Sequence, residues 1–439
     1  MIKVAIVGSG IAGLAAAHAL RGVAAITLFE AGDYFGGHTH TVDVTLATPD
    51  GPVTHGVDTG FLVLNERTYP QLIQLLQELG VATAKSDMSF SVQAHNASSK
   101  RALEWSGSSL NTVFAQRGNL LNWRFLNMLR DLMRFNKLAT RLAKQGNEGQ
   151  LKQTLGDFLR EHHFSAEFCD WYFMPMMACI WSCPTTQMLQ FPVSTMIRFC
   201  HNHGLLQISN RPQWWTVQGG ARNYVEKITA TIADKRLNTP VRHIERFAKI
   251  GGRGSSVRIA TDSGSEVFDA VIMATHSDQT LALLREPSAT ERTALGAISY
   301  QANRAVLHTD VSVLPNRKSA WAAWNYERNV ECAQTATPSV CLHYLINRLQ
   351  PLPWEQPVVV SLNPSRPIVD RHVLGAFDYA HPVFDLAANR AQYQLPWLQG
   401  QQATYFCGAW TGYGFHEDGL KSGRAAAEQL LRQMGSLTP

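Results

Sequence analysis

The fold of this chain is decided by Val7-Gly8-Ser9-Gly10-Ile11-Ala12-Gly13-Leu14, a glycine-rich turn near its start. The apolar residues before the turn predict a buried strand, and the pattern after it predicts a helix. Gly8 allows a sharp turn, Gly10 leaves room for a pyrophosphate beside the main chain, and Gly13 lets the helix pack closely against the strand. The stretch therefore predicts a strand-turn-helix unit that binds a dinucleotide.

A second apolar strand follows the helix and ends at Glu30. A carboxylate at this distance from the glycines can accept hydrogen bonds from both ribose hydroxyls and would repel a 2′-phosphate. A further glycine pair, Gly36-Gly37, comes shortly afterwards and would also meet the pyrophosphate. A nicotinamide site does not need this pair, so the sequence favours a flavin dinucleotide with an unphosphorylated adenosine.

Length and composition limit the number of domains and the classes of partner that the chain can have. A chain of 439 residues exceeds one ordinary core, so two domains are expected. Charged residues make up only 17% of the chain, which predicts large buried surfaces or an apolar ligand cavity. The net charge of +5 is mild, and the sequence has neither zinc-finger spacing nor an RNA-binding aromatic signature, so no nucleic-acid partner is expected.

The seven cysteines are odd in number and scattered, which argues against a disulfide framework and favours reduced thiols in the cytoplasm. Cys179 and Cys183 lack a histidine pair at ligand spacing, so buried structural thiols are expected rather than a metal site. The apolar run from Val4 to Leu20 contains glycines, a serine and a histidine, and we do not interpret it as an export signal. No run of about 18 apolar residues predicts a membrane span.

After the nucleotide unit, residues 41–48 and 52–58 predict a hairpin, followed by Asp58-Thr59-Gly60-Phe61. A glycine between small and aromatic residues suits either a strand against which a flat ring lies or a simple strand-end turn. Residues 69–79 then predict an amphipathic helix that stops at Gly80.

The stretch 121–144 predicts a basic amphipathic helix. Leu121, Phe125, Met128, Leu132, Phe135 and Leu142 share its apolar face, and Arg130, Arg134, Lys137, Arg141 and Lys144 share the other. Such a helix can lie on an anionic membrane. The alternative, which the sequence favours, is that the apolar face packs on the protein core while the charged face is solvated.

Large apolar side chains are dense from Phe168 to Trp181, a stretch interrupted by Pro175 and too short to span a bilayer. Aromatic and methionine clusters usually form core, and core is the favoured interpretation here. They can also line a lipophilic cavity, because methionine adapts to irregular shapes.

The nucleotide-binding pattern stops near residue 86 and resumes at Trp215-Thr216-Val217-Gln218-Gly219-Gly220. Strands are expected over 238–244, and at 257–261, around Val267 and over 270–274, which together complete a short sheet. Later strands at 305–308, 340–345 and 358–361 predict a second, largely antiparallel sheet. The last strand leads into the motif from Gly408 to Gly423 and a final helix, whose N-terminus would favour negative charge at the flavin N1/O2 edge.

With these pieces together, the sequence resembles the flavin-containing amine oxidase superfamily, which includes monoamine oxidases, protoporphyrinogen oxidase and phytoene desaturases. The resemblance rests on the first glycine motif with Phe29-Glu30-Ala31, on Gly36-Gly37, on Gly219-Gly220 and on the C-terminal motif, in family order along the whole chain. More narrowly, residues 37–41, 343–350 and 414–419 look like a bacterial subfamily of predicted FAD-binding proteins associated with fatty-acyl modification.

The resemblance implies an α/β fold with a Rossmann-like FAD-binding domain and a second α+β substrate domain that has a mostly antiparallel sheet. Both domains are discontinuous. The FAD-binding domain is expected over 1–85, 215–290 and 400–439, and the substrate domain over 86–214, mainly helical, and 291–399. The FAD contacts that carry over are Gly8, Gly10, Ile11, Ala12, Gly13, Glu30, Ala31, Gly37, His38, Thr39, Gly60, Phe61, Val241, Ala274, Gly408, Asp418, Gly419 and Leu420.

Two departures from the family pattern bear on the cofactor. His38 stands where relatives often have arginine, which makes the expected pyrophosphate contact weaker or dependent on pH. The cysteine that the amine oxidases use for covalent attachment has no clear counterpart, so non-covalent FAD is expected.

The expected reaction is hydride removal from a lipophilic substrate, a fatty-acyl chain that includes methyl-branched types, with FAD as acceptor. His343, Tyr344 and His416 are the candidates for proton removal, with Glu417 or Asp418 able to orient a histidine. Amine oxidation, with an aromatic cage of Trp410 and Tyr413, is the alternative. A non-enzymatic escort protein on the same fold is the second alternative. A cytoplasmic protein is expected, with peripheral contact at the inner membrane face through 121–144 as a further hypothesis.

Overall fold

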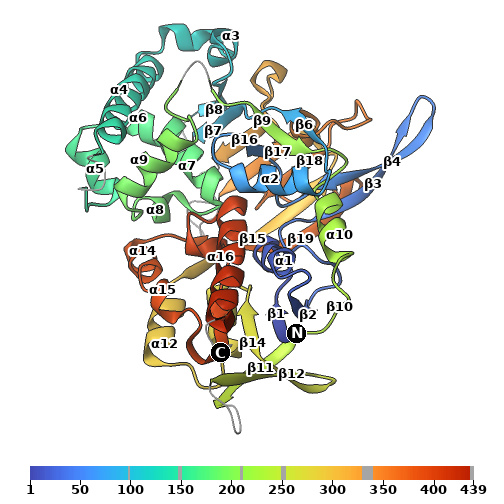
Figure 1. Cartoon of the computed structure of the whole chain (residues 1–439). Helices are drawn as coiled ribbons and strands as arrows, with labels where there is room; N and C mark the ends of the chain where they lie inside the picture. The colour runs from blue at the N-terminus through green and yellow to red at the C-terminus, as the bar shows by residue number, and fades with distance from the viewer. Residues whose placement is uncertain (97–98, 147–150, 208–210, 249–253, 329–339, 436–439) are drawn as a thin grey trace.

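The computed structural model describes residues 1–96, 99–146, 151–207, 211–248, 254–328 and 340–435. It contains two large sheets, with a layer of helices beside the second one (Figure 1). None of the helices in these described ranges is long and apolar enough to cross a membrane.

The first sheet holds the nucleotide-binding unit. Its five parallel strands run in the order β10 (Asp234–Arg236), β2 (Ala24–Phe29), β1 (Ile2–Val7), β14 (Ala270–Met273) and β20 (Thr404–Phe406). Val4 and Ile6 face one core, which they share with α1 (Ile11–Ala19) and α16 (His416–Gly435). Ala5 and Val7 face another core on the opposite side. Both faces of the sheet are thus buried, as is usual for parallel sheets.

The side of Ala5 and Val7 is covered by a separate antiparallel sheet of β11 (Val241–Ala248), β12 (Ser255–Thr261) and β13 (Gly264–Phe268). The expectation of one short sheet through residues 257–274 is therefore wrong in its pairing. β14 leaves its neighbours in sequence and pairs with β1 and β20 instead, because its wholly buried residues suit a central parallel strand.

Two glycines let the helices approach closely. A Cβ on Gly13 would overlap the carbonyl oxygen of Gly8, and a Cβ on Gly423 would overlap the carbonyl oxygen of Ala12. The first contact closes the turn against its own helix. The second lets α16 cross α1 directly, so the C-terminal helix packs beside the first dinucleotide turn.

The second sheet has seven strands in the order β19 (Val373–Val383), β15 (Ser299–His308), β18 (Val359–Leu362), β17 (Cys341–Leu345), β16 (Trp324–Arg328), β7 (Phe90–Asn96) and β8 (Ser99–Ser106). All neighbours are antiparallel except β16 and β7. The antiparallel character was predicted. β7 and β8 were not, since the stretch 86–214 was expected to be mainly helical.

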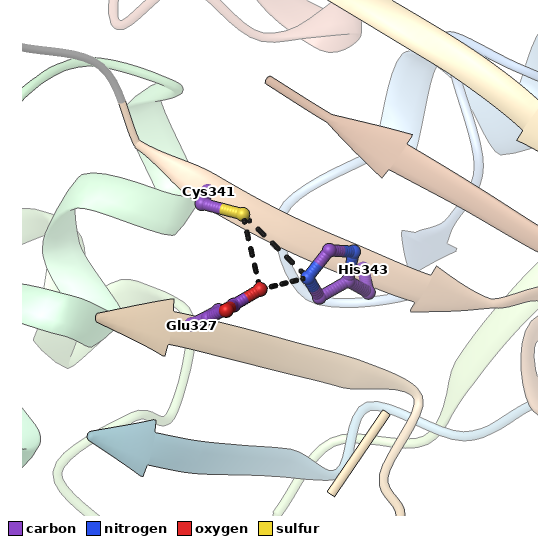
Figure 2. A group of neighbouring side chains, drawn as sticks. All are labelled: Glu327, Cys341 and His343. Carbon is purple, nitrogen blue, oxygen red and sulfur yellow. Dashed lines mark hydrogen bonds and ion pairs between the residues drawn. The ribbon is translucent and has the colours of Figure 1, made fainter. Parts of the chain in front are cut away.

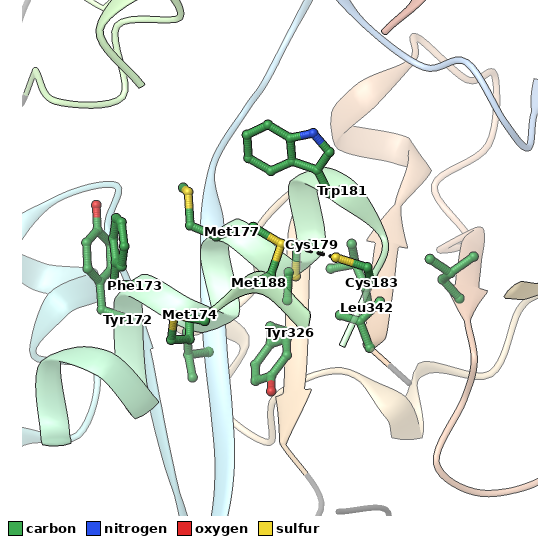
Figure 3. Close-up of a cluster of buried hydrophobic side chains, with 14 of the residues drawn as sticks. Tyr172, Phe173, Met174, Met177, Cys179, Trp181, Cys183, Met188, Tyr326 and Leu342 are labelled. Carbon is green, nitrogen blue, oxygen red and sulfur yellow. Dashed lines mark hydrogen bonds between the residues drawn. The ribbon is translucent and has the colours of Figure 1, made fainter. Parts of the chain in front are cut away.

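The rest of 86–214 forms the helical layer. It contains α4 (Trp123–Gln145), α5 (Leu155–Glu161), α6 (Ala166–Phe168), the π-helical turn η3 (Cys169–Phe173), α7 (Met174–Trp181), α8 (Thr185–Met188) and α9 (Val193–Asn202). Phe173 and Met177 are fully buried among the side chains drawn in Figure 3. Most of the aromatic and methionine stretch is therefore core, as the sequence favoured.

Helix α4 packs its apolar face inward, with Phe125, Met128 and Phe135 at 0%, 0% and 1% exposure. Leu121, which was expected on the same face, is 92% exposed instead. The helix begins only at Trp123, so Leu121 belongs to the preceding 3₁₀ turn and does not follow the helical periodicity.

The remaining elements are shorter. They are the hairpin β3 (Thr41–Thr48) and β4 (Gly51–Asp58); the small sheet of β5 (Leu64–Asn65), β9 (Trp214–Val217) and β6 (Thr83–Ser86); and the helices α2 (Pro70–Glu78), α3 (Leu110–Val113), α10 (Arg222–Thr229), α11 (Ser277–Leu283), α12 (Ala289–Gly296), α13 (Ile346–Leu349), α14 (Leu386–Gln392) and α15 (Leu395–Leu398). The predicted hairpin and the predicted helix at 69–79 are both present.

Candidate cofactor and substrate site

One continuous cavity of about 700 Å³ runs between the two sheets. Its first end is formed by the β1–α1 turn and the ends of β2 and β14, and its other end by α7, α9, β9, β16 and β17. The edge at the carboxyl ends of parallel strands is where open α/β sheets bind their ligands.

The glycine turn leaves space at the first end. Gly8 has a φ of +101°, and a Cβ there would lie 2.8 Å from the carbonyl oxygen of Ala274. At Gly10, by contrast, an added Cβ would meet no atom within 4 Å. The space beside Gly10 is therefore open to the cavity, as a pyrophosphate group requires.

Glu30 lies at the same end, directly after β2. One carboxylate oxygen accepts hydrogen bonds from the Ser9 backbone N–H at 3.0 Å and the Ser9 hydroxyl at 2.5 Å, and the other accepts from the Gly32 N–H at 2.9 Å. These bonds fix the carboxylate at the cavity wall. It is thus held in place to accept further hydrogen bonds from a ribose.

His38 brings an unpaired polar atom to this cavity. Its Nε2 is buried and has no hydrogen-bond partner in the described structure. Burial, together with the nearby His381, His276 and His416, holds the pKa of His38 well below its usual value. A neutral ring with a free nitrogen is compatible with a polar group of a bound cofactor.

The start of α16 closes the cavity beside His38. The His416 ring stacks on Phe61 with centroids 3.9 Å apart, and its Nε2 lies 2.5 Å from the Tyr224 hydroxyl. Burial lowers the pKa of His416 to about 3, so the ring is neutral. His416 lines the cavity but is a weak base.

Neither acid at this helix start orients a histidine. Glu417 accepts the backbone N–H groups of Gln71 and Leu72 and so caps α2. Asp418 accepts those of Tyr413 and Phe415, and burial raises its pKa to about 6. The prediction that one of them orients a histidine is therefore wrong, because both carboxylates bond backbone N–H groups instead.

The other end of the cavity is aromatic and apolar. Its wall includes Phe199, Trp214, Trp324, Tyr344 and Phe415, with Cys179 and Ile180 from the end of α7. Among the described lining residues of the whole cavity there is no lysine or arginine, and Glu30 at the far end is the only carboxylate. Burial raises the pKa of the Tyr344 hydroxyl, so this group is a neutral donor.

His343 does not line the cavity, although its neighbour Tyr344 in β17 does. Figure 2 shows the His343 ring directed toward Glu327 and Cys341. Its Nε2 is 3.0 Å from a carboxylate oxygen of Glu327 and its Nδ1 is 2.6 Å from the Ser361 hydroxyl. All three side chains are buried. The prediction of His343 as a catalytic base is therefore wrong, because its ring is fully buried, does not line the cavity and has both nitrogens paired within the sheet.

The buried polar row continues beyond His343. The Ser361 hydroxyl also meets Nε2 of His308 at 2.7 Å, and the Asp310 N–H donates to the other ring nitrogen of His308. Cys341 lies beside Glu327 and His343, with sulfur 3.7 Å and 3.5 Å from them. The polar atoms satisfy one another, so we interpret this row as a hydrogen-bond network of the sheet.

Thirteen of the predicted cofactor residues line the cavity. They are Gly8, Gly10, Ile11, Ala12, Glu30, Ala31, Gly37, His38, Gly60, Phe61, Val241, Ala274 and Gly408. The other five, Gly13, Thr39, Asp418, Gly419 and Leu420, do not line it and instead support the elements that do. Gly419, for example, faces Ile11 of α1, where a Cβ would lie 2.7 Å from the isoleucine side chain.

Sequence reasoning missed several lining residues, above all His276, Tyr300 and His381. His276 stacks on Tyr300 at 4.3 Å, and Nδ1 of His381 accepts a hydrogen bond from the Asn303 amide at 2.9 Å. These residues come from three separate elements and share no local motif. The pairing of β15 with β19 would have indicated Tyr300 and His381, whereas His276 precedes α11 and lies outside both strands.

The chain was compared with known protein families, curated proteins and solved structures. The sequence matches the family described as "Flavin containing amine oxidoreductase" over residues 11–349. No curated protein matches the sequence significantly.

Among solved structures, the chain is similar to putrescine oxidase bound to putrescine, with a TM-score of 0.67 at 15% identity over 98% of this chain and 99% of that one. It is also similar to a putative protoporphyrinogen oxidase from Exiguobacterium, with a TM-score of 0.64 at 16% identity and coverage of 98% and 99%. A CLA-producing fatty acid isomerase from P. acnes has a TM-score of 0.62 at 15% identity and 98% coverage of both chains. At these identities the likeness concerns the fold.

Proposed function

Because the chain belongs to the flavin-containing amine oxidoreductase family and takes FAD as its cofactor, we propose that it dehydrogenates a lipophilic substrate, an uncharged acyl chain. FAD, when bound, supplies the acceptor for a hydride. The residues that would hold it are those of the glycine turn, Glu30 and His38, which offer open space, a fixed carboxylate and a free ring nitrogen. In this proposal FAD is bound non-covalently, without a bond to cysteine.

The observation that carries the proposal is the character of the substrate end. Trp214, Trp324 and Tyr344 face a space with no cationic side chain among its described lining residues, so the charge of a free carboxylate would not be neutralised there. A protonated amine would find no carboxylate closer than Glu30, which lies at the opposite end. An uncharged chain has no charge to desolvate on entering such a space, and it gains free energy by burying apolar surface.

The titratable groups of the cavity support a particular order of events. Burial lowers the pKa of His381 to about 4 and that of His416 to about 3, and it keeps Tyr344 protonated. The chain can therefore orient a C–H bond and exclude water, but it offers no strong base. We propose that the hydride leaves first, to FAD, and that the neighbouring carbon of the resulting cation then gives its proton to a neutral imidazole of the cavity wall, for which a weak base is sufficient. This order favours an unsaturated chain, whose allylic carbon tolerates positive charge.

Amine oxidation is the second candidate, supported by the similarity to putrescine oxidase and to cyclohexylamine oxidase from Brevibacterium oxydans. The expected aromatic cage does not support it. Trp410 lines the cavity, but its indole N–H donates to the Thr275 carbonyl, and Tyr413 is not part of the lining. We also propose a cytoplasmic protein that meets the inner membrane face peripherally.

The test is anaerobic reduction of the FAD-loaded protein by unsaturated and methyl-branched acyl esters, their free acids, and primary and secondary amines. We expect bleaching of the flavin by esters, faster than by the acids. The variant Ile180→Trp should fill the substrate end and block bleaching by esters, whereas Val267→Trp, at an exposed site, should leave it unchanged. Bleaching by amines alone would establish the alternative. Failure of the apoprotein to take up FAD would favour the escort protein.

A further inference from the structure

Exposed apolar side chains gather around the start of α4 and continue along its outer face as far as Met133. We define the α4 tip as six side chains from α3, the 3₁₀ turn η1 (Arg117–Leu121) and α4. Their exposures are 79% for Leu110, 50% for Leu120, 92% for Leu121, 71% for Trp123, 42% for Leu126 and 54% for Met133. In Figure 1, α3 and α4 lie at the end of the molecule remote from both termini.

The α4 tip does not result from a poorly packed helix. Phe125, Met128 and Phe135 on the inner side of α4 are buried, and Phe135 packs on Phe173 with ring centroids 4.4 Å apart. The Asn122 side chain caps the helix by accepting from the backbone N–H of Arg124 at 3.2 Å. The helix thus satisfies its core and its N-terminus, and the exposed apolar side chains are additional to both.

Cations continue the same outer face toward the end of α4. Arg130, Lys137 and Arg141 are exposed and form no ion pair with any residue in the described ranges. Two acidic side chains near these cations, Asp131 and Glu167, already bond other groups. Asp131 is buried and bonded to Arg134 and to the Ser165 N–H, and Glu167 bonds Arg124 at 2.6 Å. The surface therefore combines apolar side chains with unneutralised positive charge.

We propose that the α4 tip and these cations dock on an anionic lipid membrane, with the apolar side chains at the level of the headgroups and the cations on lipid phosphates. An interfacial amphipathic surface of this kind gains from buried apolar area and from attraction to anionic lipid. A tryptophan at the edge suits the headgroup region because its ring is apolar and its N–H is polar. The proposal stands on its own surface and does not depend on the identity of the substrate.

Docking at this end would bring the cavity close to lipid. Helix α4 packs against α9, and Phe199 of α9 is part of the aromatic cavity wall. In the docked protein, the substrate end of the cavity would therefore lie against the helical layer that is nearest the bilayer. This relation deepens the proposed function, because an esterified acyl chain is found in membrane lipid.

The test is sedimentation of the FAD-loaded full-length protein with vesicles of phosphatidylcholine containing increasing fractions of phosphatidylglycerol. We expect binding that rises with the anionic fraction and falls as salt is added. The double variant Leu121→Ser, Trp123→Ser should weaken binding by about tenfold or more. The matched control is Tyr393→Ser, Trp397→Ser, which removes two side chains of 72% and 71% exposure elsewhere and should bind as the parent does.

Flavin absorbance and a thermal melt confirm that each variant is folded and loaded. Absence of vesicle binding at low salt overturns the proposal, and so does equal binding of the two double variants. If the parent self-associates in sedimentation velocity and only Leu121→Ser, Trp123→Ser abolishes this without altering vesicle binding, the surface is a contact between two copies. Bleaching by soluble short-chain esters is measured in parallel, so that failure of the chemistry is distinguishable from failure of docking.

Discussion

His343 and Tyr344 are adjacent in β17, yet they serve opposite faces of the second sheet. Tyr344 lines the cavity, and His343 is buried against Glu327 and Ser361 on the other side. Successive side chains of a strand point in opposite directions, so both could never have faced one flavin. The pair gives a direct way to separate a structural residue from a cavity residue.

We expect His343→Ala to lower the free energy of unfolding by about 1.5–3 kcal/mol, the range for a hydrogen bond to a charged group. Tyr344→Phe should change stability much less but alter substrate-dependent bleaching. Urea unfolding and anaerobic bleaching measure the two effects. A bleaching rate lost in folded, FAD-loaded His343→Ala would contradict this assignment.

The two glycines of the first turn should behave differently when replaced by alanine. Gly13→Ala forces a Cβ onto the Gly8 carbonyl and should cost about 1–3 kcal/mol of stability. Gly10→Ala meets no protein atom and should leave stability within about 0.5 kcal/mol of the parent. It should nonetheless weaken FAD binding by about tenfold or more, because the new methyl group occupies the pyrophosphate space. Calorimetric titration of the apoprotein with FAD decides, and unchanged affinity in Gly10→Ala would place the pyrophosphate elsewhere.

Replacing Glu30 by alanine should weaken FAD binding by about 1.5–3 kcal/mol, since a charged acceptor for the ribose is lost. The change also frees Ser9 and Gly32, so Ser9→Ala serves as the control for local disturbance. We expect Ser9→Ala to retain most of the affinity. Parent-like binding by Glu30→Ala would refute the ribose assignment.

Asp58 should make stability fall as pH rises. Burial raises its pKa to about 7, although Thr41, the Ala221 N–H and Gln350 all donate to it. Between about pH 4 and 7 the unfolded carboxyl loses its proton while the folded one keeps it, so unfolding becomes easier across this window and no further change follows above it.

The comparison is with Asp58→Asn, which cannot titrate. The stability of the parent minus that of the variant should decrease by up to about 4 kcal/mol from pH 4 to pH 7. The buried histidines act in the opposite sense, because their lowered pKa values cost stability as pH falls below about 6.5. They are common to both proteins and cancel in the difference. A difference that is flat across the window would show that Asp58 ionises normally.

Features that lie within one short stretch of sequence were predictable, whereas sites formed by residues from distant stretches were not. The glycine turn and Glu30 lie within one strand-helix-strand unit, so their spacing alone indicated their roles. His276, just before α11, and His381 of β19 line the same cavity, and no sequence spacing relates them. The pleat of β17 would have excluded His343, but only with the strand boundaries and the buried face known. Leu121 misled because the helix starts two residues later than its apolar pattern suggests.

The position of β20 constrains how the protein can be made. This last strand pairs with β14, and α16 then packs through Gly423 on α1, so the first sheet and the cavity beside it are complete only when the final part of the chain is present. On the ribosome, the helical layer and most of the second sheet emerge while the opening strand still lacks those partners. Contacts between the two ends of a chain are slow to form and leave apolar surface exposed in the meantime. Shortening the chain before Thr404 should therefore remove the cofactor site itself, and ribosome-stalled chains of that length should be sensitive to protease throughout their N-terminal region.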